Sequence, residues 1–82
     1  MKPIGKITHY YGKLGVAIIK LSDSLKTGDK IKLESGKTEF NQTVTEMQVD
    51  HKSVASAKAG DVVGIKVDQK IHEGALVSKL EE

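Results

Sequence analysis

Apolar and polar residues follow one another along the chain in short runs, and each run ends at a glycine or a polar cluster. Residues 30–33, Lys-Ile-Lys-Leu, alternate cleanly, which places the two apolar side chains on one face of a strand. Residues 14–21 are apolar on both faces, which is typical of a strand with the core on one side and another element or a partner on the other. The pattern predicts strands over residues 4–10, 14–21, 30–33, 38–49, 62–67 and 75–80.

The apolar residues within 38–49 change parity between Val44 and Met47. Side chains alternate between the two faces of a strand, so one regular strand would turn part of this apolar set away from the core. We therefore expect a bulge near Thr45 or Glu46, which would bring both parts of the set to the same face.

Two Lys-x-Gly-Asp corners, at residues 26–29 and 58–61, separate predicted strands. Gly60 can take the positive φ that a sharp reversal requires, and the carboxylate of Asp61 can accept hydrogen bonds from nearby backbone amides. Residues 53–59 contain three alanines, but so short a segment forms at most one helical turn. The chain therefore predicts an all-β fold, a small closed antiparallel β-barrel of six or seven strands.

The chain of 82 residues has no cysteine, so neither a disulfide nor a cysteine-bound metal can hold it together. A chain of this length buries only about 60% of the surface that its unfolded form exposes, so we expect modest stability from one core. We expect a single domain over residues 1–82. No apolar stretch has the length of a signal peptide or of a membrane span of roughly 20 residues, which predicts a cytoplasmic protein without membrane contact.

Positive charge is concentrated in the first half of the chain, although the net charge is only +2. Residues 1–40 hold eight lysines and four acidic residues, whereas residues 41–82 hold five lysines and seven acidic residues. Every cation is a lysine, so the planar guanidinium fork that grips phosphate or guanine with two hydrogen bonds is missing. Contact with nucleic acid would be diffuse, and a solvated lysine surface explains the same charges.

No motif of the chain indicates catalysis or a cofactor. Residues 36–38, Gly-Lys-Thr, resemble the end of a phosphate-binding loop, but Ile31 stands where the first glycine of that motif belongs. The three histidines are far apart and lack the spacing of metal ligands. The chain offers no cysteine nucleophile and no serine in a G-x-S-x-G motif. We expect a protein that is not an enzyme and that uses no metal or cofactor.

Two neighbouring tyrosines, Tyr10 and Tyr11, are the strongest candidates for contact with a partner. Adjacent residues of a strand face opposite ways, so one ring must look outward beside Lys13, where it can stack on a base. In the structural alternative, one ring closes the barrel end and the other caps its rim. The polar crossing at His51 and Lys52 is a second candidate place. The full set of candidate partner-binding or RNA-binding residues is Lys6, Tyr10, Tyr11, Lys13, Lys30, Lys32, His51 and Lys52.

Several segments agree in order and spacing with a known family: residues 26–31 (Lys-Thr-Gly-Asp-Lys-Ile), 43–52 (Thr-Val-Thr-Glu-Met-Gln-Val-Asp-His-Lys), 59–64 (Ala-Gly-Asp-Val-Val-Gly) and 74–77 (Gly-Ala-Leu-Val). They resemble the second domain of translational GTPases such as elongation factor Tu. Residues 4–11, with Phe40 and Gln42, are closer to small stand-alone elongation-factor-like proteins and to the C-terminal barrel of collagenase-like peptidases.

The resemblance implies a barrel of the translation-protein type. In the GTPases this domain packs against the nucleotide domain and helps to hold the aminoacyl end of transfer RNA or a ribosomal surface. Without a nucleotide domain, this chain alone should not bind GTP. The resemblance implies a non-catalytic binding module whose partner is RNA, the ribosome, or a translation or RNA-modifying protein. The alternative is a protein-protein adaptor, or a detached accessory barrel of a collagenase-like peptidase.

Overall fold

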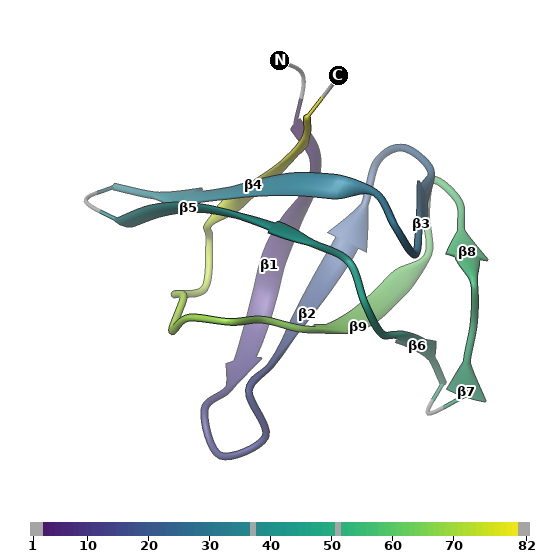
Figure 1. Cartoon of the computed structure of the whole chain (residues 1–82), viewed down its shortest axis with the longest axis horizontal. Coiled ribbons are helices and arrows are strands. Elements are labelled where there is room, and N and C mark those ends of the chain that lie inside the picture. The colour runs from purple at the N-terminus through teal and green to yellow at the C-terminus, as the bar shows by residue number, and fades with distance from the viewer. Residues whose placement is uncertain (1–2, 37, 51, 81–82) are drawn as a thin grey trace.

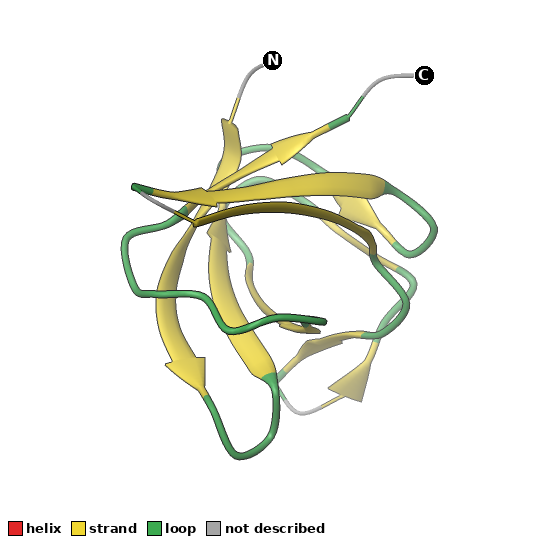
Figure 2. Ribbon diagram, turned by 60° about the vertical axis from the view of Figure 1, so that its left-hand side comes forward, coloured by secondary structure: helices red, strands yellow, loops and turns green. Residues whose placement is uncertain are grey.

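The chain folds entirely into strands, turns and loops. The structure is a computed structural model that describes residues 3–36, 38–50 and 52–80, and none of these residues is helical (Figures 1 and 2). The strands are β1 Pro3–Tyr11, β2 Val16–Leu21, β3 Leu25–Lys26, β4 Lys30–Ser35, β5 Thr38–Thr43, β6 Met47–Val49, β7 Lys52–Ser53, β8 Ser56–Ala57, β9 Val62–Lys66 and β10 Leu76–Lys79.

Eight of these strands form one antiparallel sheet in the order β5-β4-β10-β1-β2-β9-β6-β7, and β3 pairs with β8 in a separate two-stranded sheet. The predicted all-β, antiparallel fold is confirmed. Closure into a barrel is not confirmed, because the strand order of the described residues ends at β5 on one side and at β7 on the other. The predicted number of six or seven strands is wrong. Strand β3 lies at the start of the first Lys-x-Gly-Asp corner, and β7 contains Lys52 of the polar crossing. Residues 53–59, expected to form at most one helical turn, contain β8 instead.

The large sheet curls over its own inner face. In Figure 1 the β4–β5 hairpin runs across the direction of β1 and β2. A strong right-handed twist between neighbouring strands produces this curl. The first and last strands along the chain are neighbours within this sheet, because β10 pairs with β1 and Ser78 lies opposite Pro3.

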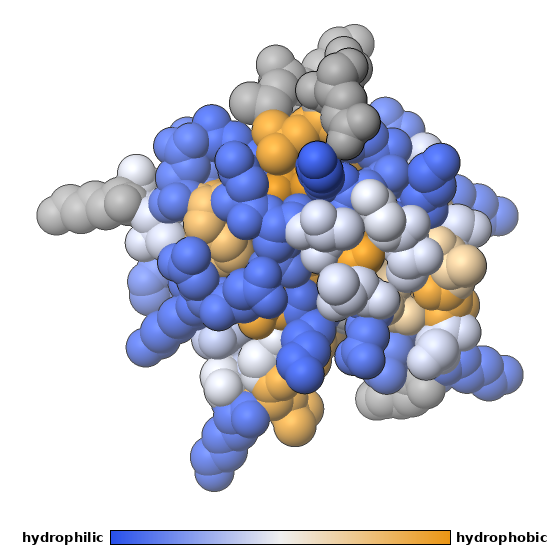
Figure 3. Space-filling view, viewed as in Figure 1, coloured by the Kyte–Doolittle hydropathy of each residue, from blue (hydrophilic) through white to orange (hydrophobic). Residues whose placement is uncertain are grey.

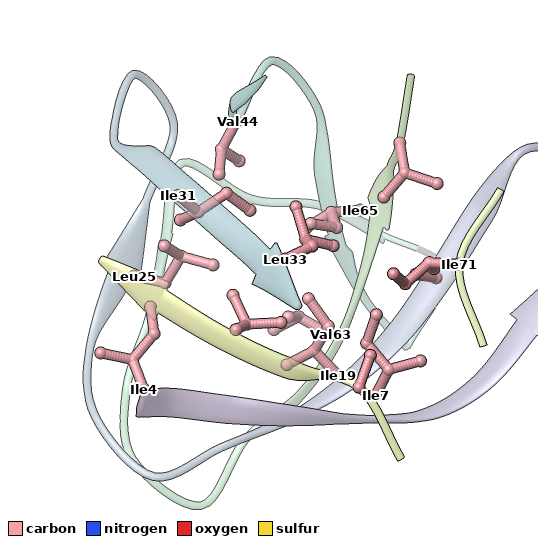
Figure 4. Packing of buried hydrophobic residues seen from close by; sticks show 14 of the residues in the cluster. Ile4, Ile7, Ile19, Leu25, Ile31, Leu33, Val44, Val63, Ile65 and Ile71 are labelled. Atoms are coloured by element: carbon pink, nitrogen blue, oxygen red, sulfur yellow. The ribbon is translucent and has the colours of Figure 1, made fainter. Parts of the chain in front are cut away.

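One apolar core fills the inside of the curl (Figure 4). Alternate residues of β2 and β4 point into it, and Ile31 and Leu33 are both fully buried, as their alternation predicts. The other members come from most of the remaining strands and from the loops between them. The core residues are Ile4, Ile7, Ala17, Ile19, Leu21, Leu25, Ile31, Leu33, Phe40, Val44, Met47, Val63, Ile65, Val67, Ile71, Ala75 and Val77.

Both Lys-x-Gly-Asp corners have the predicted chemistry. Gly28 and Gly60 have φ values of 94° and 93°, which are in the region that glycine adopts without strain. At each corner an aspartate carboxylate accepts a hydrogen bond from the backbone amide three residues earlier, at 3.0 Å for Asp29 and 3.1 Å for Asp61. Pairing of β3 with β8 brings the segments that precede the two corners together.

The parity change between Val44 and Met47 has another cause than the predicted bulge. The segment forms two strands, β5 and β6, and residues 44–46 between them belong to no strand. Val44 and Met47 are both buried, because the break lets the chain turn before β6 starts on β9. The prediction of a bulge near Thr45 or Glu46 is therefore wrong, although Val44 and Met47 both face the core as expected.

Candidate partner-binding surface

The candidate residues lie on three separate parts of the surface. Lys6 and Tyr11 belong to β1, and Lys13 lies in the turn that follows it. The second part is β4, with Lys30 and Lys32, and the third is β7, with Lys52; His51 lies outside the described residues. The structure therefore does not gather the candidates into one site.

The two tyrosines face opposite ways, as predicted for neighbours on a strand. Tyr10 is half-buried and packs against the core, whereas Tyr11 is 46% exposed. The Tyr11 ring lies 4.4 Å from the ring of His9, at a tilt of 58°. His9 Nδ1 in turn lies 3.2 Å from Glu73 Oε2. The outward tyrosine thus belongs to a small cluster with His9 and Glu73 on the outer face of β1.

Lys32 is already satisfied by acidic residues of its own hairpin. Its Nζ lies 2.6 Å from Glu39 Oε1 and 4.0 Å from Glu34 Oε2. The hydrogen bond to Glu39 is the main cause that raises the pKa of Lys32, while partial burial acts in the opposite direction. Lys79 is half-buried, and its Nζ lies 3.5 Å from Asp29 Oδ2. Lysines on this side of the sheet are thus engaged within the chain.

An apolar groove of about 300 Å³ opens on the outer face of β2 and β9. Most hydrophobic side chains surface only in small areas among hydrophilic ones on the face seen in Figure 3. The groove differs, since three of the four large, exposed hydrophobic residues among the described ones line it: Tyr11 46%, Leu14 69% and Val62 50%. The complete lining is Tyr11, Leu14, Val16, Ile18, Gln48, Asp50, Val62, Val63 and Gly64.

Gly64 lets the side chains of Val16 and Ile18 pack closely against β9 in the groove. A β-carbon at Gly64 would lie 3.3 Å from Ile18 Cδ1 and 3.3 Å from Val16 Cγ1, both tighter than ordinary contact. The two branched side chains of β2 therefore lie against bare backbone of β9. This is the outward apolar face that the pattern of residues 14–21 predicts.

Sequence reasoning found part of the groove and missed part of it. One ring of the Tyr10–Tyr11 pair was expected to face outward, and the structure shows that it is Tyr11; Val16 and Ile18 belong to the strand predicted to be apolar on both faces. Leu14 was missed because it was placed inside that strand, whereas it lies in the turn before it. Val62 was missed because the sequence of its strand does not show which face of the strand is exposed to solvent.

The described residues contain no group of three or more His, Cys, Asp or Glu side chains that could hold a metal ion. They also include no helix with the length and apolarity that a membrane crossing requires. The groove, with its aliphatic lining, is suited to binding and offers no set of reactive groups in contact with one another.

No family model matches the chain. An uncharacterized protease of Methanocaldococcus jannaschii is 42% identical over 81 residues, which cover 96% of this chain and 20% of the protease. The chain therefore spans about a fifth of the length of the curated relative that it matches.

Two crystal structures of the C-terminal domain of a protein assigned to the U32 peptidases in Geobacillus thermoleovorans have the same fold. One has a TM-score of 0.91 at 16% identity and covers 98% of this chain and 93% of that domain. The other, a selenomethionine variant, has a TM-score of 0.89 at 15% identity and covers 94% of this chain and 98% of that domain. These matches support the resemblance to the barrel of collagenase-like peptidases and give no support to the resemblance to translational GTPases.

Proposed function

We propose that this chain is a non-catalytic accessory β-domain of the kind carried by collagenase-like peptidases, and that it acts by binding protein. The observation that carries the proposal is the 42% identity to one fifth of a longer protease. A stretch of that length in a larger enzyme is a domain, and its fold is the fold of a C-terminal domain of a U32 peptidase.

The surface of the chain supports a binding role. An open apolar groove lined by Tyr11, Leu14 and Val62 is a feature that small soluble domains normally keep for a partner. A protein partner fits the comparisons best. The similar proteins are named as proteases, and an accessory domain of a protease would contact the rest of that protein. The earlier expectation of RNA or the ribosome as partner has no support from these relatives.

The binding part of the proposal is tested with the Methanocaldococcus protease itself. Its matching segment is deleted, and the purified chain is titrated into the shortened protease by calorimetry. We expect binding to the shortened protease and none to the full-length protease, whose own segment occupies the place. No binding to a shortened protease that remains folded by circular dichroism would overturn the docking role.

The non-catalytic part is tested with the chain alone. The purified chain is incubated with fluorescently labelled casein and gelatin, and we expect no release of label above buffer. Cleavage that persists through repurification would overturn this part.

The RNA alternative is tested by titrating transfer RNA into the chain at low and at high salt. Tight binding that weakens steeply with salt would favour an RNA partner instead, because lysine contacts with phosphate release counterions.

A further inference from the structure

A row of four paired residues crosses the outer face of the sheet beside the groove. Leu76 on β10 lies opposite Lys6 on β1, Lys6 lies opposite Lys20 on β2, and Lys20 lies opposite Val62 on β9. Paired residues of neighbouring strands point to the same side, so an exposed apolar residue closes each end of the row and two lysines stand between them. Since Val62 also lines the groove, the lysine pair lies next to it.

The lysine pair is unfavourable as it stands. Directly opposite residues of an antiparallel pair have β-carbons about 4.5 to 5.5 Å apart, and like charges at that position destabilise the sheet. Neither Lys6 nor Lys20 has an acidic partner within ion-pair distance in the part of the chain that the structure describes.

A directly opposite pair of acidic residues among the described strands has a compensating cation within the chain. Glu34 and Glu39 also lie directly opposite each other, on β4 and β5. Lys32 reaches both carboxylates, at 4.0 Å and 2.6 Å, and so supplies the opposite charge from within the chain. The described residues supply no such opposite charge to Lys6 and Lys20, so a carboxylate of a partner can supply it.

Two further lysines lie at the groove. Lys66 lies opposite Val16, which lines the groove, and Lys13 lies between the lining residues Tyr11 and Leu14. Both lysines are exposed and without an ion pair among the described residues. Asp50 is the single acidic residue in the lining. An occupant that complements this surface is therefore apolar in the middle and acidic at its ends.

We propose that the groove is the docking site of the accessory domain, and that it takes a protein segment with an aliphatic side chain flanked by carboxylates. The aliphatic side chain enters the groove between Leu14 and Val62, and one carboxylate lies between Lys6 and Lys20. This inference rests on the proposed function, which supplies the class of partner. The groove and its lysines are features of this chain's own structure. RNA fits less well, because most of the groove lining is aliphatic, only one aromatic ring lines it, and no arginine is present.

The first experiment measures binding of variants to the shortened protease. Lys20→Glu should weaken binding by about tenfold or more, since it repels the partner carboxylate, yet it should raise or preserve the thermal midpoint, since it turns the like pair with Lys6 into an opposite pair. Leu14→Ser, at a residue 69% exposed, should weaken binding without unfolding the chain. Lys70→Glu is the matched control, with the same charge change at an exposed loop residue outside the groove, and should change binding by less than about threefold.

If the chain binds the shortened protease but Lys20→Glu and Leu14→Ser bind as tightly as the parent chain, the groove proposal is overturned and the accessory function stands. A fall in the thermal midpoint of Lys20→Glu would also contradict the argument from the lysine pair.

A second experiment does not depend on the protease. The blocked tetrapeptide Glu-Leu-Leu-Glu is titrated into the chain at millimolar concentration and followed by two-dimensional amide NMR. Lys-Leu-Leu-Lys and a short oligouridylate serve as comparisons. We expect shifts with the acidic peptide at residues 11–20 and 62–66 and weaker ones with the basic peptide. No shift in these residues, equal shifts with both peptides, or larger shifts there with the oligouridylate would each overturn the proposal. Shifts with the acidic peptide, together with no binding to the shortened protease, would support the groove and refute the accessory function.

Discussion

Gln42 on β5 donates a hydrogen bond of 2.8 Å from its side-chain Nε2 to the main-chain carbonyl oxygen of Lys66 at the end of β9. Its Oε1 accepts a second bond of 2.9 Å from the backbone amide of Asp68. No ladder pairs β5 with β9 among the described residues. One buried side-chain amide thus links the free edge of the sheet to the far side of the curl.

We predict that Gln42→Met, which keeps the volume of the side chain, lowers the free energy of unfolding by about 1 to 3 kcal/mol. The carbonyl of Lys66 and the amide of Asp68, which form partly buried hydrogen bonds with Gln42, both lose their partner, and that loss costs about this much. Urea unfolding at neutral pH measures it. Asn41→Ala, at the exposed neighbour, is the control and should change stability by no more than about 0.5 kcal/mol. Equal unfolding midpoints for the two variants would contradict this role of Gln42.

Local features of the fold could be predicted from the sequence, and long-range ones could not. The positive φ of Gly60 and the buried positions Ile31 and Leu33 follow from residue type and alternation alone. Whether β5 meets a partner strand depends on how far the whole sheet curls, and no single segment encodes that. Gln42 gave one usable signal, because it is a polar residue with the same parity as the buried Phe40.

The candidate surface shows the same division. Alternation along a strand predicted that one of Tyr10 and Tyr11 faces outward, but which of the two does so is known only from the structure. The lysine pair of Lys6 and Lys20 was not foreseen as a pair, since it depends on the register between β1 and β2, which includes a shift between Ile7 and His9. Exposed lysines on separate strands become a site only when the register places them side by side.

Gly60→Val should lower stability more than Lys52→Ala. The φ of 93° at Gly60 is costly for any side chain and most costly for a β-branched one, so we expect a loss of about 1 to 3 kcal/mol. A β-carbon there meets nothing within 4 Å, so the loss reflects backbone conformation and not a clash. Lys52 is exposed, and its truncation should cost no more than about 0.5 kcal/mol. Thermal unfolding followed by circular dichroism compares the two, and equal midpoints would contradict the assignment.

Gly5→Ala should destabilise the chain for a different reason. Gly5 does not have a positive φ, but its added β-carbon would lie 2.6 Å from Ile19 Cγ2 and 3.0 Å from the backbone oxygen of Lys20. Overpacking of this kind costs about 1 to 3 kcal/mol, because β1 and β2 would have to move apart. Gly12→Ala is the matched control, since its β-carbon meets only the Tyr10 ring, at 3.6 Å. Urea midpoints measure both variants, and a Gly5 variant as stable as the Gly12 variant would show that the two strands can separate freely.

The ion pair of Lys32 predicts how stability responds to alkaline pH. Its hydrogen bond to Glu39 raises the pKa of Lys32 above the ordinary 10.5, so folding favours the protonated form. The stabilisation is therefore fully present below the ordinary pKa and is lost as the pH rises through the raised one. Between about pH 8 and about pH 11.5, the parent chain should lose more stability in urea than Lys32→Met does, because the variant has no such pair to lose. Lys70→Met, which removes an exposed lysine, should follow the parent chain over the same range. Parallel loss of stability in the parent chain and in Lys32→Met would mean that the pair with Glu39 contributes nothing in solution.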